Sequence, residues 1–225
     1  MEEGGRISPY RERYRRELDE LRVLTDALAG QVGLAIERSV TALRDSDVNL
    51  ARQVIREDQV VDDQSQRIEN MCMELLALQQ PMAKDLRRIV GVIKIGIDLE
   101  RIGDLAVDVA RVTAQSKEKI QITKLEYIPT MAEISRRMLS EAMDALMKGD
   151  ADQARQATKW DYEIDGLYVK ARDKLLKIII ERPEVLSEGT SLLMVNRHLE
   201  RIGDHICNIC EAIVYIVEGK REHLN

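Results

Sequence analysis

Apolar residues return every three or four positions along almost the whole chain, and polar residues fill the positions between them. Leu21, Leu24, Leu28 and Val32 show this spacing in the first long segment. This period places the apolar side chains on one face of an α-helix, whereas a half-buried strand would alternate with period two. Almost no segment alternates in that way, so the sequence predicts an all-α protein.

Prolines and turn-forming residues divide this pattern into separate helices. Pro81 and Pro183 interrupt helical segments, because proline removes a backbone donor and clashes with the preceding turn. Gly149 is suited to end one helix and Asp150 to begin the next, while Gly219 follows the last one. The six expected helices span about residues 10–43, 48–79, 82–115, 128–148, 150–181 and 187–218, with a polar linker at 116–123.

The chain contains an internal repeat. The run Leu-Glu-Arg-Ile-Gly-Asp occupies residues 99–104 and returns unchanged at 199–204. A weaker pair of acidic segments lies one helix earlier in each half, at residues 58–62 and 161–165. The order of the repeats therefore agrees with the order of the helices, which indicates a duplicated unit. We expect two tandem, structurally similar three-helix bundles, formed by residues 1–117 and 118–225.

Each of the four repeated segments carries two carboxylates at positions i and i+4, which are neighbours on a helix. In the third helix, Ile93 and Ile97 lead along one stripe to Glu100 and Asp104, and Asp108 extends it. In the second helix, the corresponding stripe consists of Val54, Asp58, Val61, Ser65, Ile68 and Cys72. We expect both stripes to face the bundle interior, so that the acids interrupt apolar surfaces.

A buried pair of carboxylates is costly unless an opposite charge compensates it. Two such pairs on adjacent helices would gather four acids in one place, and a divalent or trivalent cation binds well to oxygen ligands of this kind. Carboxylate-bridged metal ions occur in other helical bundles. The alternative is that the acids line wet, convergent faces and pair with Arg101 or Arg201.

Glycine occurs at the same place in both copies of the repeated run, at Gly103 and Gly203. Glycine inside a helix costs about 1 kcal/mol relative to alanine, so two glycines at one motif position point to a steric requirement. We expect a close approach of the neighbouring helix at these positions, with a metal cluster as the alternative obstruction.

The last helix holds further candidate side chains. Cys207 and Glu211 share the acidic face of this helix and are candidate auxiliary ligands, whereas the single pair Cys207 and Cys210 does not predict a structural zinc site. His205 is expected at the surface or at an interface. Trp160, just before Asp161, is expected to anchor the bundle.

Charge and composition exclude several classes of protein. The net charge of −6 gives no excess of basic residues for non-specific binding to nucleic acid. No stretch approaches the roughly 18 apolar residues of a membrane span, and residues 1–10 do not form an apolar signal region. Three cysteines do not form a disulfide framework. These features predict a cytoplasmic protein.

The motifs resemble the signature of a known family. The runs that carry the resemblance are Asp85 to Lys94, Asp98 to Asp104, and His198 to His205. They are similar to the PhoU family over nearly the whole chain, which implies two PhoU-like, spectrin-like helical bundles. The resemblance further implies a homodimeric cytoplasmic accessory protein of the phosphate ABC transporter. It would repress the phosphate-starvation response by connecting the ATPase PstB to the sensor histidine kinase PhoR, and would reach the membrane only through these partners.

The resemblance also implies metal clusters on the acidic motifs, with iron as the first choice and manganese, magnesium or zinc as other candidates. The implied ligands are Asp58, Asp62, Glu100 and Asp104 in the first half and Asp161, Asp165, Glu200 and Asp204 in the second half, and Asp108 is an additional candidate. Asn208 stands where the first half has Asp108, so the two sites are expected to differ in metal content or affinity.

A different class of function is a carboxylate-bridged di-iron enzyme. Enzymes of this kind place a histidine three residues after a glutamate on their bundle helices. His198, His205 and His223 all lack a glutamate at that position. The sequence therefore favours a regulator without enzymatic activity.

Overall fold

The computed structural model describes residues 9–116 and 126–224, which form seven α-helices and one short 3₁₀ helix. No strand occurs within these described ranges, so the all-α prediction is confirmed. The elements are α1 (Pro9–Asp45), α2 (Val48–Gln79), α3 (Ala83–Gln115), α4 (Ile128–Lys148), α5 (Ala151–Ala157), α6 (Lys159–Glu181), η1 (Pro183–Val185) and α7 (Leu186–Glu218).

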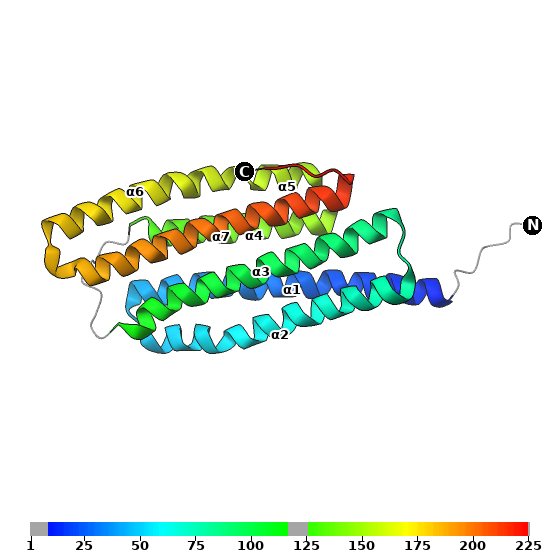
Figure 1. The fold of residues 1–225 in the computed structure, drawn as a ribbon, viewed down its shortest axis with the longest axis horizontal. Coiled ribbons are helices and arrows are strands. Elements are labelled where there is room, and N and C mark those ends of the chain that lie inside the picture. Colours follow the sequence, from blue (N-terminus) through cyan, green and yellow to red (C-terminus); the bar gives the residue numbers. More distant parts are fainter. Residues whose placement is uncertain (1–8, 117–125, 225) are drawn as a thin grey trace, which may run out of the picture.

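The helices form two bundles that lie side by side (Figure 1). The first contains α1, α2 and α3, and the second contains α4 to α7. Helices α3 and α7 run antiparallel through the middle of the molecule and pack against each other, while α1 packs against α4. Helices α2 and α6 lie on opposite outer sides (Figure 1). The expected pair of similar bundles is present, whereas the proposed boundary at residues 117 and 118 falls outside the described residues.

Aspartates and a glycine cap several helix ends, including the predicted boundary at Gly149 and Asp150. The side chain of Asp47 accepts hydrogen bonds of 2.9 Å from the backbone of Asn49 and Leu50, which caps the start of α2. Asp150 caps α5 by accepting a 2.9 Å bond from the backbone of Gln153. Gly149 ends α4 with a φ of 67°, a left-handed conformation that glycine adopts without a steric penalty.

The predicted fifth helix is not continuous, because a turn at Thr158 separates α5 from α6. The Thr158 hydroxyl donates a 2.9 Å hydrogen bond to the carbonyl of Arg155. A regular helix would offer this carbonyl to the amide of Lys159, so the threonine side chain competes with the helical bond and bends the chain. The prediction of one helix over 150–181 was therefore wrong at this point.

The core is almost entirely aliphatic and continues from one bundle into the other. The expected stripe on α2 is buried, including Val54, Val61 and Ser65. The stripe on α3 was predicted to face the bundle interior, and this was wrong for Ile97, which is 52% exposed. Ile97 lies on the side of α3 where a groove opens towards α7, at the edge of the core. No helix in the described ranges is both long and apolar enough to cross a lipid bilayer.

Candidate metal centres

The acids of the first half converge where α2 packs against α3. Asp58 on α2 is half-buried, and the negative charges of Asp62, Asp104 and Asp108 all act on it. Burial raises the pKa of Asp58 to about 6, and these neighbouring carboxylates add to the rise. Helix packing therefore brings together acidic side chains from two helices in a place where their charges oppose one another.

The second half repeats this arrangement where α6 packs against α7. Asp161 is only 4% exposed, and burial followed by the charges of Asp165 and Asp204 raises its pKa to about 6. Glu200 lies in the same cluster, with its side chain 13% exposed and its pKa raised by burial and by Asp204. This second cluster contains the more deeply buried carboxylates.

Arginines one helical turn away pair with some of these acids. Arg101 lies 3.0 Å from Asp104, and Arg111 lies 2.6 Å from Asp108. In the second half, Arg197 forms an ion pair with Glu200. The alternative of arginine pairing is thus correct for Arg101, and these cations compensate part of the acidic charge at the outer edge of each cluster.

Two buried carboxylate oxygens have no hydrogen-bond donor among the described residues. They are Oδ1 of Asp161 and Oε2 of Glu200, and both are buried. Buried polar atoms in folded proteins nearly always have a partner, so these two oxygens are the atoms of the cluster that are available to an ion or a water molecule. The donor chemistry fits a metal ion, although no three His, Cys, Asp or Glu side chains in the described ranges already stand in a ligand arrangement.

Comparison with known proteins identifies a family that has this duplicated architecture. The PhoU domain matches residues 25–113 and, a second time, residues 128–213, which are the two helical bundles described above.

The chain belongs to the PhoU family.

Several relatives support this assignment. The chain is 34% identical over 210 residues to the phosphate-specific transport system accessory protein PhoU homolog of Clostridium acetobutylicum, covering 93% of this chain and 96% of that protein. It is 37% identical over 205 residues to the homolog of the same name from Rhizobium meliloti, covering 89% and 86% of the two chains.

Solved PhoU structures share the fold. The crystal structure of the phosphate transport system regulatory protein PhoU from Streptococcus pneumoniae has a TM-score of 0.86 at 30% identity, covering 93% of this chain and 99% of that one. The PhoU structure from Pseudomonas aeruginosa has a TM-score of 0.82 at 34% identity, with coverage of 92% and 100%. These proteins are named as accessory or regulatory proteins and not as enzymes, so the comparisons do not support the di-iron enzyme.

The PhoU motif glycines allow the close helix approach that was predicted. A Cβ atom on Gly103 would lie 3.1 Å from Cγ1 of Val61 and 3.6 Å from Oδ1 of Asp58. A Cβ atom on Gly203 would overlap Oδ1 of Asp161 and lie 3.2 Å from Cδ1 of Ile164. Glycine therefore leaves room for the outer helix and its carboxylate in each PhoU domain.

Sequence reasoning missed one polar neighbour of the first cluster. The hydroxyl of Ser65 on α2 lies 3.3 Å from Oε2 of Glu100 and 3.4 Å from the carbonyl oxygen of Gly96. Ser65 stands on the same helical stripe as Asp58, and a second polar residue on this mainly apolar stripe was the available signal. This hydroxyl orients the glutamate towards the interface of α2 and α3.

The two candidate auxiliary ligands on α7 behave differently. Cys207 is 1% exposed and lies within interaction range of Asp161, whose negative charge adds to the effect of burial in raising the pKa of the thiol. Glu211 instead accepts a 2.9 Å hydrogen bond from the backbone of Leu224 and lies 3.5 Å from His223. The C-terminal segment thus engages Glu211, and the structure does not support it as a ligand.

Two other side chains have the structural roles that were expected of them. Nδ1 of His205 lies 2.9 Å from Oδ1 of Asp98, so this histidine belongs to the interface of α3 and α7. Trp160 packs against the core and donates a 2.8 Å hydrogen bond from its ring nitrogen to Glu141. Arg137 lies over the Trp160 ring at 4.2 Å from its centre. Neither side chain takes part in the acidic clusters.

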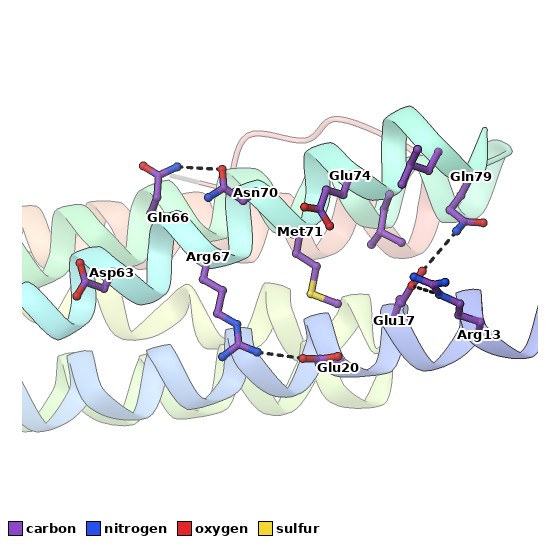
Figure 2. A pocket seen from close by; sticks show the side chains of 12 residues that line it. Arg13, Glu17, Glu20, Asp63, Gln66, Arg67, Asn70, Met71, Glu74 and Gln79 are labelled. Atoms are coloured by element: carbon purple, nitrogen blue, oxygen red, sulfur yellow. Dashed lines mark hydrogen bonds and ion pairs between the residues drawn. The ribbon is translucent and has the colours of Figure 1, made fainter.

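A separate groove lies between α1 and α2, and Figure 2 shows the side chains that line it. Its volume is about 530 Å³. Its two arginines pair with two of its acids, because Arg13 lies 2.8 Å from Glu17 and Arg67 lies 3.1 Å from Glu20. The remaining acids, Asp63 and Glu74, are exposed to solvent, so the groove lacks the buried carboxylates of the acidic clusters and is a weaker candidate site.

Proposed function

We propose that this protein is a regulatory accessory protein of phosphate-specific transport. The observation that carries the proposal is the match of the PhoU domain to both bundles. Relatives that cover almost the whole chain are named for this transport system, which supports the same role here. The absence of a recognisable catalytic motif in the sequence is consistent with an output through binding.

In this role the protein acts through contacts with other proteins on the cytoplasmic side of the membrane. Its partners are the transporter ATPase PstB and the sensor histidine kinase PhoR, and it functions as a homodimer. When phosphate is plentiful, the protein holds the phosphate-starvation response in its repressed state. Two similar bundles in one chain offer two related surfaces, which suits a connection between a transporter and a kinase.

The acidic clusters bind metal ions in the proposed function, one group of ions in each half and iron first among the candidates. A bound cation would supply positive charge between the opposing carboxylates of two helices. In this proposal Asp58 and Asp161 would hold the outer helix to the ion, and Glu100 and Glu200 would hold the inner helix. The support for this part is the pair of unpaired buried oxygens on Asp161 and Glu200.

Deletion of the protein tests the regulatory role. In a strain without it, a reporter for a phosphate-starvation promoter should be active even at high phosphate, and expression of the wild-type chain should restore repression. A pull-down with PstB and PhoR checks the partners separately. A deletion strain that still represses the reporter normally at high phosphate would overturn the regulatory proposal.

A further inference from the structure

The two acidic clusters differ at one buried position. Three residues after the last aspartate of the repeated motif, the first half has Val107 and the second half has Cys207. Val107 is 2% exposed, and Cys207 is 1% exposed. Each lies beside the aspartate of the outer helix, because Val107 lines a groove of about 340 Å³ together with Asp58, and Cys207 is within interaction range of Asp161. The halves therefore offer different atoms at the same place.

The surroundings of Cys207 contain unused ligand atoms. Asp161 is 4% exposed, and its carboxylate accepts a hydrogen bond from the thiol of Cys207. Its other oxygen, Oδ1, has no hydrogen-bond donor among the described residues. This oxygen packs against Gly203 and occupies the space that a side chain would take there. Oε2 of Glu200 on the same helix as Cys207 is also buried and without a described donor. The thiol of Cys207 thus lies next to the buried carboxylate of Asp161, and Glu200, two turns earlier on α7, adds a second buried carboxylate that acts on Asp161.

We propose that Cys207 supplies a sulfur ligand to the metal ion of the second half, so that the two halves select different metals. This inference rests on the proposed metal binding. Sulfur favours borderline ions such as zinc, iron(II) and cobalt(II), whereas a site made of oxygens alone favours magnesium and manganese. The thiol proton leaves to solvent as the bond from Sγ to the metal forms, and no oxidation state changes.

The competing interpretation is that Cys207 is a small core residue like the other cysteines. Cys210, one turn later on α7, is 0% exposed and belongs to the main core. Cys72 on α2 is likewise 0% exposed. Cys210 is therefore the matched control, since it is a buried thiol on the same helix. Valine is the natural replacement at 207, because the first half already carries it at the equivalent position.

Cobalt(II) binding tests the inference directly. Reduced, metal-free protein is titrated with cobalt(II) at neutral pH, and the near-ultraviolet charge-transfer band of a thiolate bound to cobalt is recorded. Retained cobalt is counted by equilibrium dialysis. Wild type and Cys210→Ala should show the band, and Cys207→Val should lose it. Adding Val107→Cys to the Cys207→Val protein should restore a band in the first half.

Zinc affinity gives a second readout. Cys207→Val should weaken zinc binding in the second half by roughly tenfold or more, because the loss of a residue that only hydrogen-bonds to a metal ligand already lowers metal affinity by about that factor. Manganese binding should change little. Cys207→Ala serves if the valine variant does not fold by circular dichroism. If wild-type protein retains cobalt but shows no thiolate band, the sulfur ligand is overturned and the proposed metal binding is not. Wild-type protein that retains no cobalt overturns this inference together with the proposed metal binding.

Discussion

Nδ1 of His205 on α7 lies 2.9 Å from Oδ1 of Asp98 on α3, and this contact joins the two halves of the chain. Both side chains are mostly buried, with 19% and 15% of their side-chain surfaces exposed. The same carboxylate oxygen accepts a 3.2 Å hydrogen bond from Asn208. Asp98 is therefore a shared acceptor at the centre of the interface between the bundles.

Replacing Asp98 with alanine should destabilise the packing of α3 against α7. The change leaves His205 and Asn208 without their acceptor, and a partly buried polar group that loses its partner costs about 1–3 kcal/mol. Urea unfolding followed by circular dichroism measures the loss. Asp144→Ala is the control, because its pair with Lys148 at 3.8 Å is exposed and should be worth less than about 1 kcal/mol. Equal effects of the two changes would contradict the assigned role of Asp98.

The metal-free protein should show a pH dependence that Asp58 and Asp161 set. Their folded pKa values are raised to about 6, so the folded state binds protons that the unfolded state has released. The contribution of these two carboxyl groups to the free energy of unfolding therefore increases as the pH falls from 7.5 towards 5. Burial lowers the pKa of His198, which acts in the opposite direction over the same interval.

Comparison with asparagine variants isolates the effect of these carboxylates. Without metal, Asp58→Asn and Asp161→Asn should melt at a higher temperature than wild type at pH 7.5, because each change removes a repelled charge. The advantage should shrink towards pH 5, where the wild-type carboxyls become protonated. Thermal melts across this range check the sign, and a constant difference at all pH values would contradict the raised pKa values.

The motif glycines should respond unequally to alanine. Gly203→Ala should cost about 1–3 kcal/mol, because its Cβ would overlap the Asp161 carboxylate. Gly103→Ala should cost less, since its closest contact is 3.1 Å from a methyl group of Val61. Gly30→Ala in α1 meets no atom within 4 Å and should stabilise the protein by about 1 kcal/mol through helix propensity. A denaturation series on these three variants gives the order.

Removing the acids of one half should leave metal binding in the other half. Glu100→Ala with Asp104→Ala should lower metal content to that of the second site, and Glu200→Ala with Asp204→Ala should do the reverse. The single tryptophan of the chain is Trp160, next to Asp161, so its fluorescence reports on the second half. Quenching by cobalt(II) should persist in the first double variant and vanish in the second. Unchanged metal stoichiometry in both would refute the assigned ligands.

The sequence predicted the helices and the pairing of acids because both depend on local spacing. Identical motif runs at 99–104 and 199–204 identified the duplication, and Gly149 and Asp150 marked a helix boundary correctly. These signals lie within one or two helical turns, where the geometry of a helix fixes which side chains are neighbours.

Features that depend on packing between helices could not be predicted in the same way. The break at Thr158 arises because its hydroxyl bonds to a backbone carbonyl, yet threonine also occurs inside unbroken helices. Ile97 is exposed because of where α7 packs on α3, and Glu211 is engaged by the C-terminal segment. Helical periodicity identifies a face of a helix but not the neighbour that covers it.

The antiparallel contact of α3 with α7 has a reciprocal form. In the two repeats, Asp98 corresponds to His198, and Asp108 corresponds to Asn208. Asp98 accepts a 3.2 Å hydrogen bond from Asn208, and the negative charge of Asp108 acts on the pKa of His198, so the same pair of positions meets twice. Reciprocal contacts of this kind are the mark of a twofold symmetric dimer. The packing of α3 on α7 therefore has the form of a twofold symmetric interface between two copies of one helical unit within a single chain. Because both copies belong to one chain, the two sides of this interface need not be identical, and valine can stand at position 107 where the other copy has cysteine at 207 without breaking the pairing of the helices.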